Sequence, residues 1–450
     1  MAKQKFSLST TQIIMLSFLL VIFVGSLLLS LPVSSADGEG VPYPDALFTA
    51  TTATCVTGLV TLPTCSTWSV FGQVVILILI QVGGLGVITV MSALMIMLQK
   101  RMSISDRLLL QDAFNLNSLG GIVKFVKRVL LGTFLVEGAG ALLYMTVFVP
   151  AFGPRGIWIS VFTSISAFCN AGIDILSENS LCEYAANPVV NIVTSLLIIL
   201  GGIGYIVWWD VLGLGKEAGK RRRFCNLTLH SKIAIVTSLI LLFGGGVFIF
   251  LLEYNNPLTI GNLSLFDKIQ VSMFQSVTTR TAGFATVPQQ NLTDAAAVFS
   301  LLLMFIGGSP VGTAGGIKTV TFAVLAVSAL ATIRNKQEVS VFHRNITRQA
   351  VNKAVAVTMM SFAILFISTV LLLFFTDADV LDVLYETVSA TATVGLTRNL
   401  TPYLNTAGKA VIIGTMYLGR VGPISLALAL YSPKEQQNII RNPAEEISVG

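Results

Sequence analysis

The chain has 450 residues, of which 54% are hydrophobic and only 11% are charged, and its formal net charge is +6. A soluble domain carries roughly 25% charged residues. This composition, with a mean hydropathy of +0.81, therefore excludes a soluble globular protein and predicts an integral membrane protein. Five cysteines without a tandem Cys-x-x-Cys pair, and only two histidines, argue against a disulfide scaffold or a His/Cys metal site.

The first apolar run follows two lysines, Lys3 and Lys5, and extends from about residue 13 to residue 31. The letters VSSA after it resemble a signal-peptide cleavage site, but the run is longer than the 7–15 residues of a signal core. About 20 apolar residues are enough to span a bilayer as a helix. We therefore predict a retained first transmembrane helix.

Apolar runs of spanning length then recur along the whole chain. They lie near residues 11–33, 70–98, 129–149, 189–214, 231–252, 295–333, 354–375 and 408–431. Between the two members of each successive pair lies a shorter segment, rich in Ser, Thr and Ala, that ends in glycine. These segments read FTATTATCVTG (48–58), FTSISAFCNAG (162–172), FQSVTTRTAG (274–283) and YETVSATATVG (385–395).

The final glycines of these segments recur at a nearly constant interval. Gly58, Gly172, Gly283 and Gly395 are separated by 114, 111 and 112 residues, and a fixed period indicates an internal repeat. The sequence predicts an all-α membrane protein in which four helix–pore loop–helix repeats, with eight transmembrane helices, surround a pseudo-fourfold pore. The predicted repeats are 1–110, 111–225, 226–340 and 341–450.

Each second apolar run also carries a glycine cluster. The clusters read QVGGLG (81–86), LGGIGY (200–205), IGGSPVG (306–312) and LGRVGP (418–423). For the first two clusters we favour simple packing, because small residues let membrane helices approach closely.

The charges predict an orientation. Lys and Arg crowd the connections around residues 100–107, 216–232 and 334–353, which favours a cytoplasmic side rather than a nucleic-acid site in so apolar a chain. Both termini are then cytoplasmic, and the four glycine loops open outward. The opposite connections hold the acids Asp37, Glu39, Asp45, Asp174, Glu178, Glu183, Asp377, Asp379 and Asp382. We expect these acids to concentrate cations at the mouth.

The short segments are too short to span the bilayer and too polar to face lipid. Non-helical backbone at membrane depth occurs only where it lines a cavity or is buried in protein. Four such loops around one axis would point rings of carbonyl oxygens inward, as the TVGYG loops of potassium channels do to replace the hydration shell of the ion. The predicted potassium-binding filter residues are Val56, Thr57, Gly58, Asn170, Ala171, Gly172, Thr281, Ala282, Gly283, Thr393, Val394 and Gly395.

The stretch IGGSPVGTAGGIKT (306–319) interrupts the second apolar run of the third repeat. It is not a Walker phosphate loop, because Ile317 precedes Lys318 and the GxxxxGK[ST] spacing fails. As one straight helix, residues 295–333 would extend about 58 Å at 1.5 Å per residue, against a hydrocarbon core of roughly 30 Å. We therefore predict two half-helices joined by a flexible loop beneath the filter.

Three cations, Arg280, Lys318 and Arg420, fall within apolar segments, where a charge indicates a functional site by default. For Arg280 we favour a structural role, in which it pairs with an acid and anchors its half-helix. Arg420 is either a cation barrier that also hydrogen-bonds carbonyls of the glycine loop, which we favour, or part of a packing ion pair. Lys318 either holds the loop or extends to the cytoplasmic side.

The chain resembles the Trk/Ktr/HKT superfamily of potassium transporters over essentially its full length, and its Ktr-type membrane subunits most closely. The resemblance rests on the four glycine loops and on SVTTRTAGF (276–284), GGSPVGTAGGIKT (307–319) and GRVGP (419–423). It implies potassium uptake, often sodium-dependent, with the broken helix as an intramembrane gate. The implied gate residues are Gly307, Gly308, Gly312, Gly315, Gly316, Lys318 and Arg420.

The resemblance also implies partners. Ktr-type membrane subunits form homodimers with one pore per protomer and associate with a cytoplasmic ring of nucleotide-binding, KtrA-like regulatory subunits. K⁺ is then the substrate and Na⁺ an activator or coupled ion, with no covalent cofactor and no enzymatic activity. A sodium-permeable carrier on the same scaffold is the alternative, although in the family serine at the first filter glycine is associated with sodium permeation, and Gly58 therefore favours potassium. Channel-like and symport mechanisms both remain open.

The cysteines raise two separate points. Cys55 and Cys169, at the third position before their filter glycines, depart from the family pattern, although carbonyl coordination needs no particular side chain there. Cys65 and Cys182 fall in predicted external loops, where either a disulfide or simple packing is open.

Overall fold

The computed structural model describes residues 9–98, 104–113, 121–217, 224, 226–336 and 338–422. Each of four successive stretches holds a long helix, a short buried helix, an extended loop and a further helix or helix pair, as predicted. The strands in the described part are β1 (Ser340–Val341) and β2 (Arg344–Asn345), which form a small antiparallel hairpin. The fold is therefore all-α, in agreement with the sequence.

The first helices of the repeats are the long ones. They are α1 (Thr10–Leu29), α7 (Ile122–Phe152), α11 (Leu229–Glu253) and α15 (Arg348–Phe375). All four are long enough and apolar enough to cross a membrane. Three of them begin at a hydroxyl side chain that caps the free N–H groups of the first turn, namely Ser9, Thr228 and Thr347.

The short helices are the predicted Ser/Thr/Ala-rich segments. They are α2 (Tyr43–Cys55), α8 (Arg155–Cys169), α12 (Leu265–Thr278) and α16 (Val380–Ala392). Nearly every residue in the second half of each is buried. One short helical turn follows each loop: α3 (Thr64–Thr67), then the 3₁₀ turns η2 (Cys182–Tyr184), η3 (Gln289–Asn291) and η4 (Thr401–Tyr403). A further 3₁₀ turn, η1 (Pro32–Ser34), follows α1.

The second helices are more broken than the sequence analysis expected. They are α4 (Val70–Leu85) with α5 (Val87–Met97), α9 (Pro188–Gly202) with α10 (Tyr205–Glu217), α13 (Asp294–Phe305) with α14 (Thr319–Ile333), and α17 (Thr406–Val421). A separate helix, α6 (Ile104–Ala113), follows α5. Side chains at Ser69, Asn187, Thr293 and Asn405 cap the starts of these four elements.

The runs 70–98 and 189–214, expected as single spans, each bend sharply. The bends measure 96° between α4 and α5 and 93° between α9 and α10. They occur at Gly86 and Gly204, whose φ angles of +86° and +92° are accessible to glycine without a Cβ penalty. The break predicted for the third repeat is confirmed. The part of the 408–431 run beyond residue 422 lies outside the described residues, and the count of eight spans stays a prediction.

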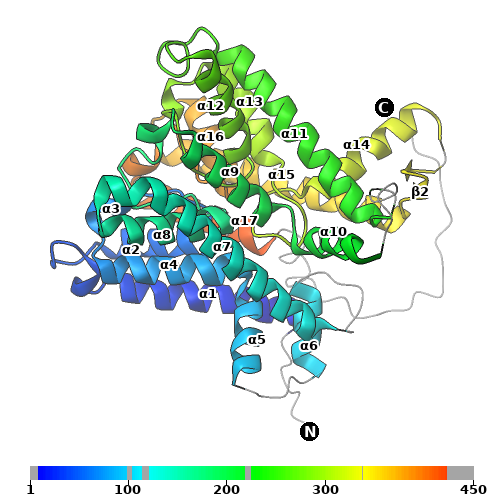
Figure 1. Cartoon of the computed structure of the whole chain (residues 1–450), viewed down its shortest axis with the longest axis horizontal. Helices are drawn as coiled ribbons and strands as arrows, with labels where there is room; N and C mark the ends of the chain where they lie inside the picture. Colours follow the sequence, from blue (N-terminus) through cyan, green and yellow to red (C-terminus); the bar gives the residue numbers. More distant parts are fainter. Residues whose placement is uncertain are drawn as a thin grey trace.

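The four repeats close into a ring. Each second helix packs against the short helix of the next repeat, in the pairs α4–α8, α9–α12, α13–α16 and α17–α2. In Figure 1 the blue and cyan helices of the first two repeats lie below the green helices of the third, and α17 lies between them. The short helices and the second helices therefore alternate around this ring, and the loops that follow the short helices meet at its centre.

Glycines make this close packing possible. A methyl group at Gly83, Gly201 or Gly419 would overlap the carbonyl oxygen of Thr54, Phe168 or Thr391, respectively. Each of these carbonyls belongs to the residue four places before a filter glycine, at the end of a short helix. The clusters at 83–86 and 201–204 therefore do have the packing role that we favoured for them.

This packing predicts a stability difference within one helix. In α17, Gly419→Ala places a methyl group against the Thr391 carbonyl, and overpacking of this kind costs about 1–3 kcal/mol. Gly414→Ala is the matched control, because a methyl group there has no neighbour within 4 Å. We expect the melting temperature of the detergent-solubilised protein to fall by roughly 2–8 °C for the first variant only. Equal melting temperatures for the two variants would contradict this account.

Candidate functional site

The four loops at the centre share one backbone conformation. Two residues before each filter glycine, the chain takes the left-handed conformation, at Val56 (φ +55°), Asn170 (φ +60°), Thr281 (φ +64°) and Thr393 (φ +52°). The four filter glycines also have positive φ angles. A non-glycine residue rarely adopts positive φ. Its recurrence in the same place in four repeats therefore indicates a common structural purpose.

The filter glycines lie in one tight ring. A methyl group at Gly58 would lie 2.6 Å from the carbonyl oxygen of Ala171, and one at Gly172 would lie 2.6 Å from that of Ala282. Two further contacts complete the ring: a methyl group at Gly283 would lie 2.5 Å from the Val394 carbonyl, and one at Gly395 would overlap the Thr57 carbonyl. Each loop therefore touches the next, and the fourth touches the first. The structure brings the predicted filter segments together.

A set of hydroxyl groups fastens the loops, and the sequence analysis missed it. The hydroxyls of Thr52 and Ser389 each accept the N–H of the filter glycine six residues later, at 3.0 Å. In the second repeat Ser166 accepts from Ile173 N–H at 3.1 Å, and in the third Thr278 donates to the Phe284 carbonyl at 2.6 Å. A Ser or Thr five or six residues before every filter glycine was the available signal.

Several buried polar atoms beside the ring have no hydrogen-bond partner within the described residues. They are the hydroxyls of Thr54, Thr57, Thr391 and Thr393 and both amide atoms of Asn170. Unsatisfied buried polar groups are rare in folded proteins and call for an explanation. They cluster around the first, second and fourth loops, and this makes the region suited to a cation or its water.

The loop between α13 and α14, which we call the gate loop (residues 306–318), folds back on itself. Gly307 N–H donates to Ile317 C=O at 2.9 Å, and Ile317 N–H donates to Phe305 C=O at 3.2 Å. The gate loop then docks on the break between α9 and α10. Ser309 and Thr313 donate N–H groups to the carbonyls of Gly202 and Gly201, at 2.8 and 3.1 Å.

The gate loop also contacts the filter loops. Gly315 N–H donates to the Thr281 hydroxyl at 3.1 Å, and the Thr313 hydroxyl donates to the Phe168 carbonyl at 3.0 Å. A methyl group at Gly315 would lie 2.7 Å from the Ala392 carbonyl oxygen. The gate loop therefore lies directly against the filter-bearing segments of the second, third and fourth repeats.

All three apolar-segment cations donate to carbonyls of the gate loop, and Arg420 and Lys318 do so in its second half. The Arg420 guanidinium donates from Nη1 to the Thr313 carbonyl at 2.6 Å and from Nη2 to the Gly83 carbonyl at 2.5 Å. It bonds carbonyls, as expected for a brace, and no acid pairs with it among the described residues. Lys318 Nζ donates to the Ala314 carbonyl at 2.5 Å. Lys318 therefore holds the loop and does not extend away from it.

Arg280 corrects an expectation. It was expected to pair with an acid, but in the part of the chain that the structure describes its guanidinium has only neutral acceptors. Nη1 donates to the Ser238 carbonyl at 3.4 Å, and Nη2 donates to the Ser238 hydroxyl at 3.2 Å and to the Gly307 carbonyl at 3.3 Å. The sequence could not reveal this, because Ser238 and Gly307 lie on other elements.

A cavity of about 700 Å³ adjoins the gate loop. Its lining includes the gate cations Lys318 and Arg420, the start of α1, and the break between α4 and α5. The cavity is large enough for several waters around an ion.

The predicted external acids are not all free charges. Asp45 pairs with Lys409 at 2.6 Å and Asp382 pairs with Arg398 at 2.7 Å, so these two contribute little net negative charge. Asp174, two residues after Gly172, has no cation partner within the described residues. Burial raises the pKa of the Asp174 carboxyl to about 6, although the Leu176 N–H donates to it. Cys65 and Cys182 are free thiols.

Comparisons with known proteins agree with this architecture. A sequence profile described as TrkH, cation transport protein, matches residues 3–441. The Ktr system potassium uptake protein B of Bacillus subtilis is 40% identical over 440 residues, covering 98% of this chain and 96% of that protein. The potassium/sodium uptake protein NtpJ of Enterococcus hirae is 36% identical over 450 residues, covering 98% of each.

A solved structure shares the fold. The crystal structure of the potassium transporter TrkH from Vibrio parahaemolyticus matches with a TM-score of 0.76 at 16% identity, covering 96% of this chain and 86% of that one. The helix–pore loop–helix repeats predicted from the sequence are therefore confirmed, as is the resemblance that the glycine motifs indicated.

Proposed function

This chain belongs to the TrkH family of cation transport proteins, and from that premise we propose that it takes up potassium across the cell membrane. The names of two relatives support this substrate, since one is a potassium uptake protein and the other a potassium/sodium uptake protein. The observation that carries the proposal is the closed ring of four glycine loops. Carbonyl rings of this kind replace the hydration shell of potassium.

We propose that the twelve predicted filter residues line the selectivity filter and that the gate loop closes the path beneath it. The gate residues are Gly307, Gly308, Gly312, Gly315, Gly316, Lys318 and Arg420. The hydrogen bonds of Arg420 to the gate loop and to α4 support this assignment. A fixed guanidinium beside the path repels a cation, and removing the brace frees the loop.

The remaining proposals concern assembly and topology. We propose a multi-pass plasma-membrane protein with both termini cytoplasmic, working as a homodimer with a nucleotide-binding, KtrA-like regulatory ring. We also propose that sodium acts as an activator or coupled ion. The repeats would meet near residues 110, 225 and 340. The first of these boundaries falls within α6 and the last within the β1–β2 hairpin.

Flux in reconstituted vesicles tests the function. Purified protein in proteoliposomes should move rubidium, a potassium analogue, down an imposed gradient and should admit much less sodium. Unlabelled potassium should compete with rubidium. Equal rubidium and sodium fluxes would instead favour the sodium-permeable carrier, the second function that the name of the Enterococcus relative supports. No flux of either ion, with or without a regulatory subunit, would refute transport.

Selectivity should depend on the first filter glycine. In Gly58→Ser the added Cβ would lie 2.6 Å from the Ala171 carbonyl oxygen, and the serine would have to adopt a φ of +101°. We expect a lower rubidium-to-sodium flux ratio, because the ring can no longer keep its spacing, with little change in basal gating. The matched control is Gly138→Ala, where a methyl group meets nothing within 4 Å. An unchanged ratio in Gly58→Ser would show that this loop does not select ions.

Gating should depend on Arg420. Arg420→Ala removes one charge-assisted brace, worth about 1.5–3 kcal/mol, so basal rubidium flux should rise roughly tenfold or more. Deleting residues 310–312 from the gate loop should act in the same direction. The ion ratio should persist in Arg420→Ala, since the filter ring is untouched. Arg128→Ala is the control, because Arg128 lies over the Trp209 ring and has no hydrogen bond to the gate loop within the described residues. Unchanged flux with lost selectivity would mean that gate and filter are wrongly assigned.

A further inference from the structure

Arg280 is a charge that the filter and gate as described do not explain. The residue is only 8% exposed, and within the described residues no acid neutralises it. A charge at membrane depth is costly and marks a functional site by default. What must be explained is why the third filter loop carries a buried guanidinium.

The position of Arg280 in the repeats is informative. It stands three residues before the filter glycine Gly283, and the corresponding residues in the other repeats are Cys55, Cys169 and Ala392. Three repeats thus place a small side chain here, and only the repeat that contains the gate loop places a cation. A structural requirement shared by all four loops would not place a cation in one repeat only. A requirement specific to the gate loop would do so.

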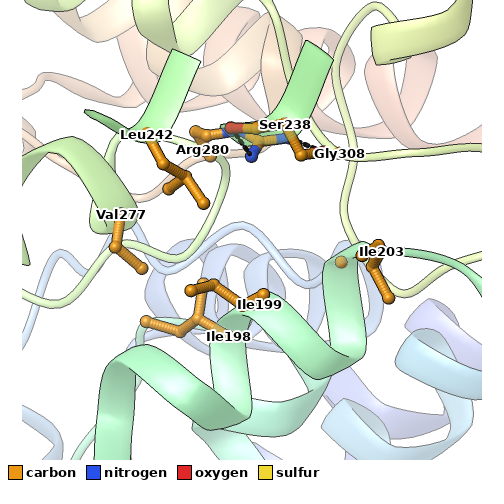
Figure 2. A pocket seen from close by; sticks show the side chains of 9 residues that line it. Ile198, Ile199, Ile203, Ser238, Leu242, Val277, Arg280 and Gly308 are labelled. Carbon is orange, nitrogen blue, oxygen red and sulfur yellow. Dashed lines mark hydrogen bonds between the residues drawn. The ribbon is translucent and has the colours of Figure 1, made fainter. Parts of the chain in front are cut away.

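The contacts of Arg280 reach the first glycine of the gate loop. Its Nη2 donates to the Gly307 carbonyl at 3.3 Å and to the Ser238 hydroxyl of α11 at 3.2 Å. Figure 2 shows Arg280 lying with Ser238 beside Gly308, while Ile198 and Ile199 of α9 stand on the opposite side of a cavity. The guanidinium therefore joins the filter-bearing segment, α11 and the gate loop.

A small cavity adjoins this guanidinium, which is not fully hydrogen-bonded. The cavity next to it measures about 20 Å³ and is lined mainly by Ile, Leu and Val side chains. Arg280 Nε has no partner among the described residues. Two of the three hydrogen bonds of the guanidinium go to Ser238 of α11 and the third goes to Gly307, so Arg280 links the gate loop to α11 and to its own filter segment.

The neighbouring residue ties down the far side of the gate loop. Thr281, a predicted filter residue, accepts the N–H of Gly315 at 3.1 Å. Two adjacent residues of the third filter loop thus hold the gate loop at positions 307 and 315. Arg420, by contrast, bonds the loop at Thr313 and bonds α4, and within the described residues it has no hydrogen bond to a filter segment.

We propose that Arg280 is a positioning residue that couples the filter to the gate: it clamps the gate loop to the third filter loop, so that the loop cannot open without disturbing the filter. The proposal rests on the transport function proposed above and goes beyond it, because it makes the filter and the gate loop move together. It distinguishes Arg280, whose loss alters gating and selectivity together, from Arg420, whose loss alters gating alone.

The test combines a gate reporter with ion flux. Ser309 is fully buried in the gate loop, so Ser309→Cys, in a background whose five native cysteines are replaced, reports loop opening through its reaction with a water-soluble maleimide. In full-length protein in proteoliposomes, Arg280→Gln should raise the labelling rate by about tenfold or more. It should also raise basal rubidium flux and lower the rubidium-to-sodium ratio.

Two further variants distinguish a specific effect of Arg280 from misfolding. Arg280→Lys keeps the charge and one donor, and its labelling rate and ion ratio should fall between those of the parent and Arg280→Gln. Lys268→Gln is the matched control, because Lys268 is a similarly buried cation on α12, the helix that precedes Arg280, and donates to the Tyr254 carbonyl at 3.0 Å. It should leave both labelling and ion ratio at the parent values.

The outcomes separate this proposal from the proposed function. Unchanged labelling in Arg280→Gln overturns the clamp, and so does an equal rise in Lys268→Gln, which would mean general loosening. Faster labelling with an unchanged ion ratio overturns the coupling, because gate and filter would then move independently. A parent protein that moves neither ion refutes the transport function, while the labelling rates still decide whether Arg280 holds the loop.

Discussion

The architecture depends on direct contacts between backbone segments that have no side chain between them. At the filter ring, each glycine faces a carbonyl of the adjoining loop at a distance that would not admit a Cβ. Slightly below the ring, glycines of three second helices meet carbonyls at the ends of the short helices in the same way. These two layers of contact determine how closely four repeats approach one axis, and they leave carbonyl oxygens concentrated there. Since a carbonyl oxygen is a good ligand for a weakly hydrated cation, the packing constraint and the proposed chemistry have one origin.

The gate loop is subject to the same constraint of close backbone packing, and an electrostatic constraint acts on it as well. A glycine-rich segment at membrane depth must find partners for its backbone groups within the protein. Here they come from the helix break at Gly201–Gly204, from a threonine of the filter and from three cations. Buried cations that bond carbonyls instead of acids remain positively charged toward their surroundings. Such groups suit the closed state of a cation path, since they stabilise the loop and oppose the ion at once.

The face that we predict to be external has a different balance of charge. Among the acids that the sequence predicts to be external, Asp45 and Asp382 are paired with cations from other segments. Asp174 is buried near the second filter loop and has no cation partner among the described residues. Two of these acids are therefore neutralised, and the negative charge on this face is smaller than a count of acids indicates. The four repeats share a backbone plan but differ in charge, which fits the gate that we propose for the third repeat.

The sequence by itself determined the membrane class, the fourfold period, the glycine that ends each loop and the break in the third repeat. Each is a local property, set by hydropathy over a helix length or by residues that only one backbone conformation suits. Only the tertiary structure decided the rest. In the sequence, the glycines at the two bends, Gly86 and Gly204, look like ordinary small packing residues of an apolar run. The residues whose hydroxyls fasten the loops, such as Thr52, look like ordinary polar residues of a short helix. The partner of Arg280 was beyond sequence reasoning, because an acid is the usual expectation for a buried cation, whereas the carbonyl it meets at Gly307 belongs to a loop whose place depends on the closure of all four repeats.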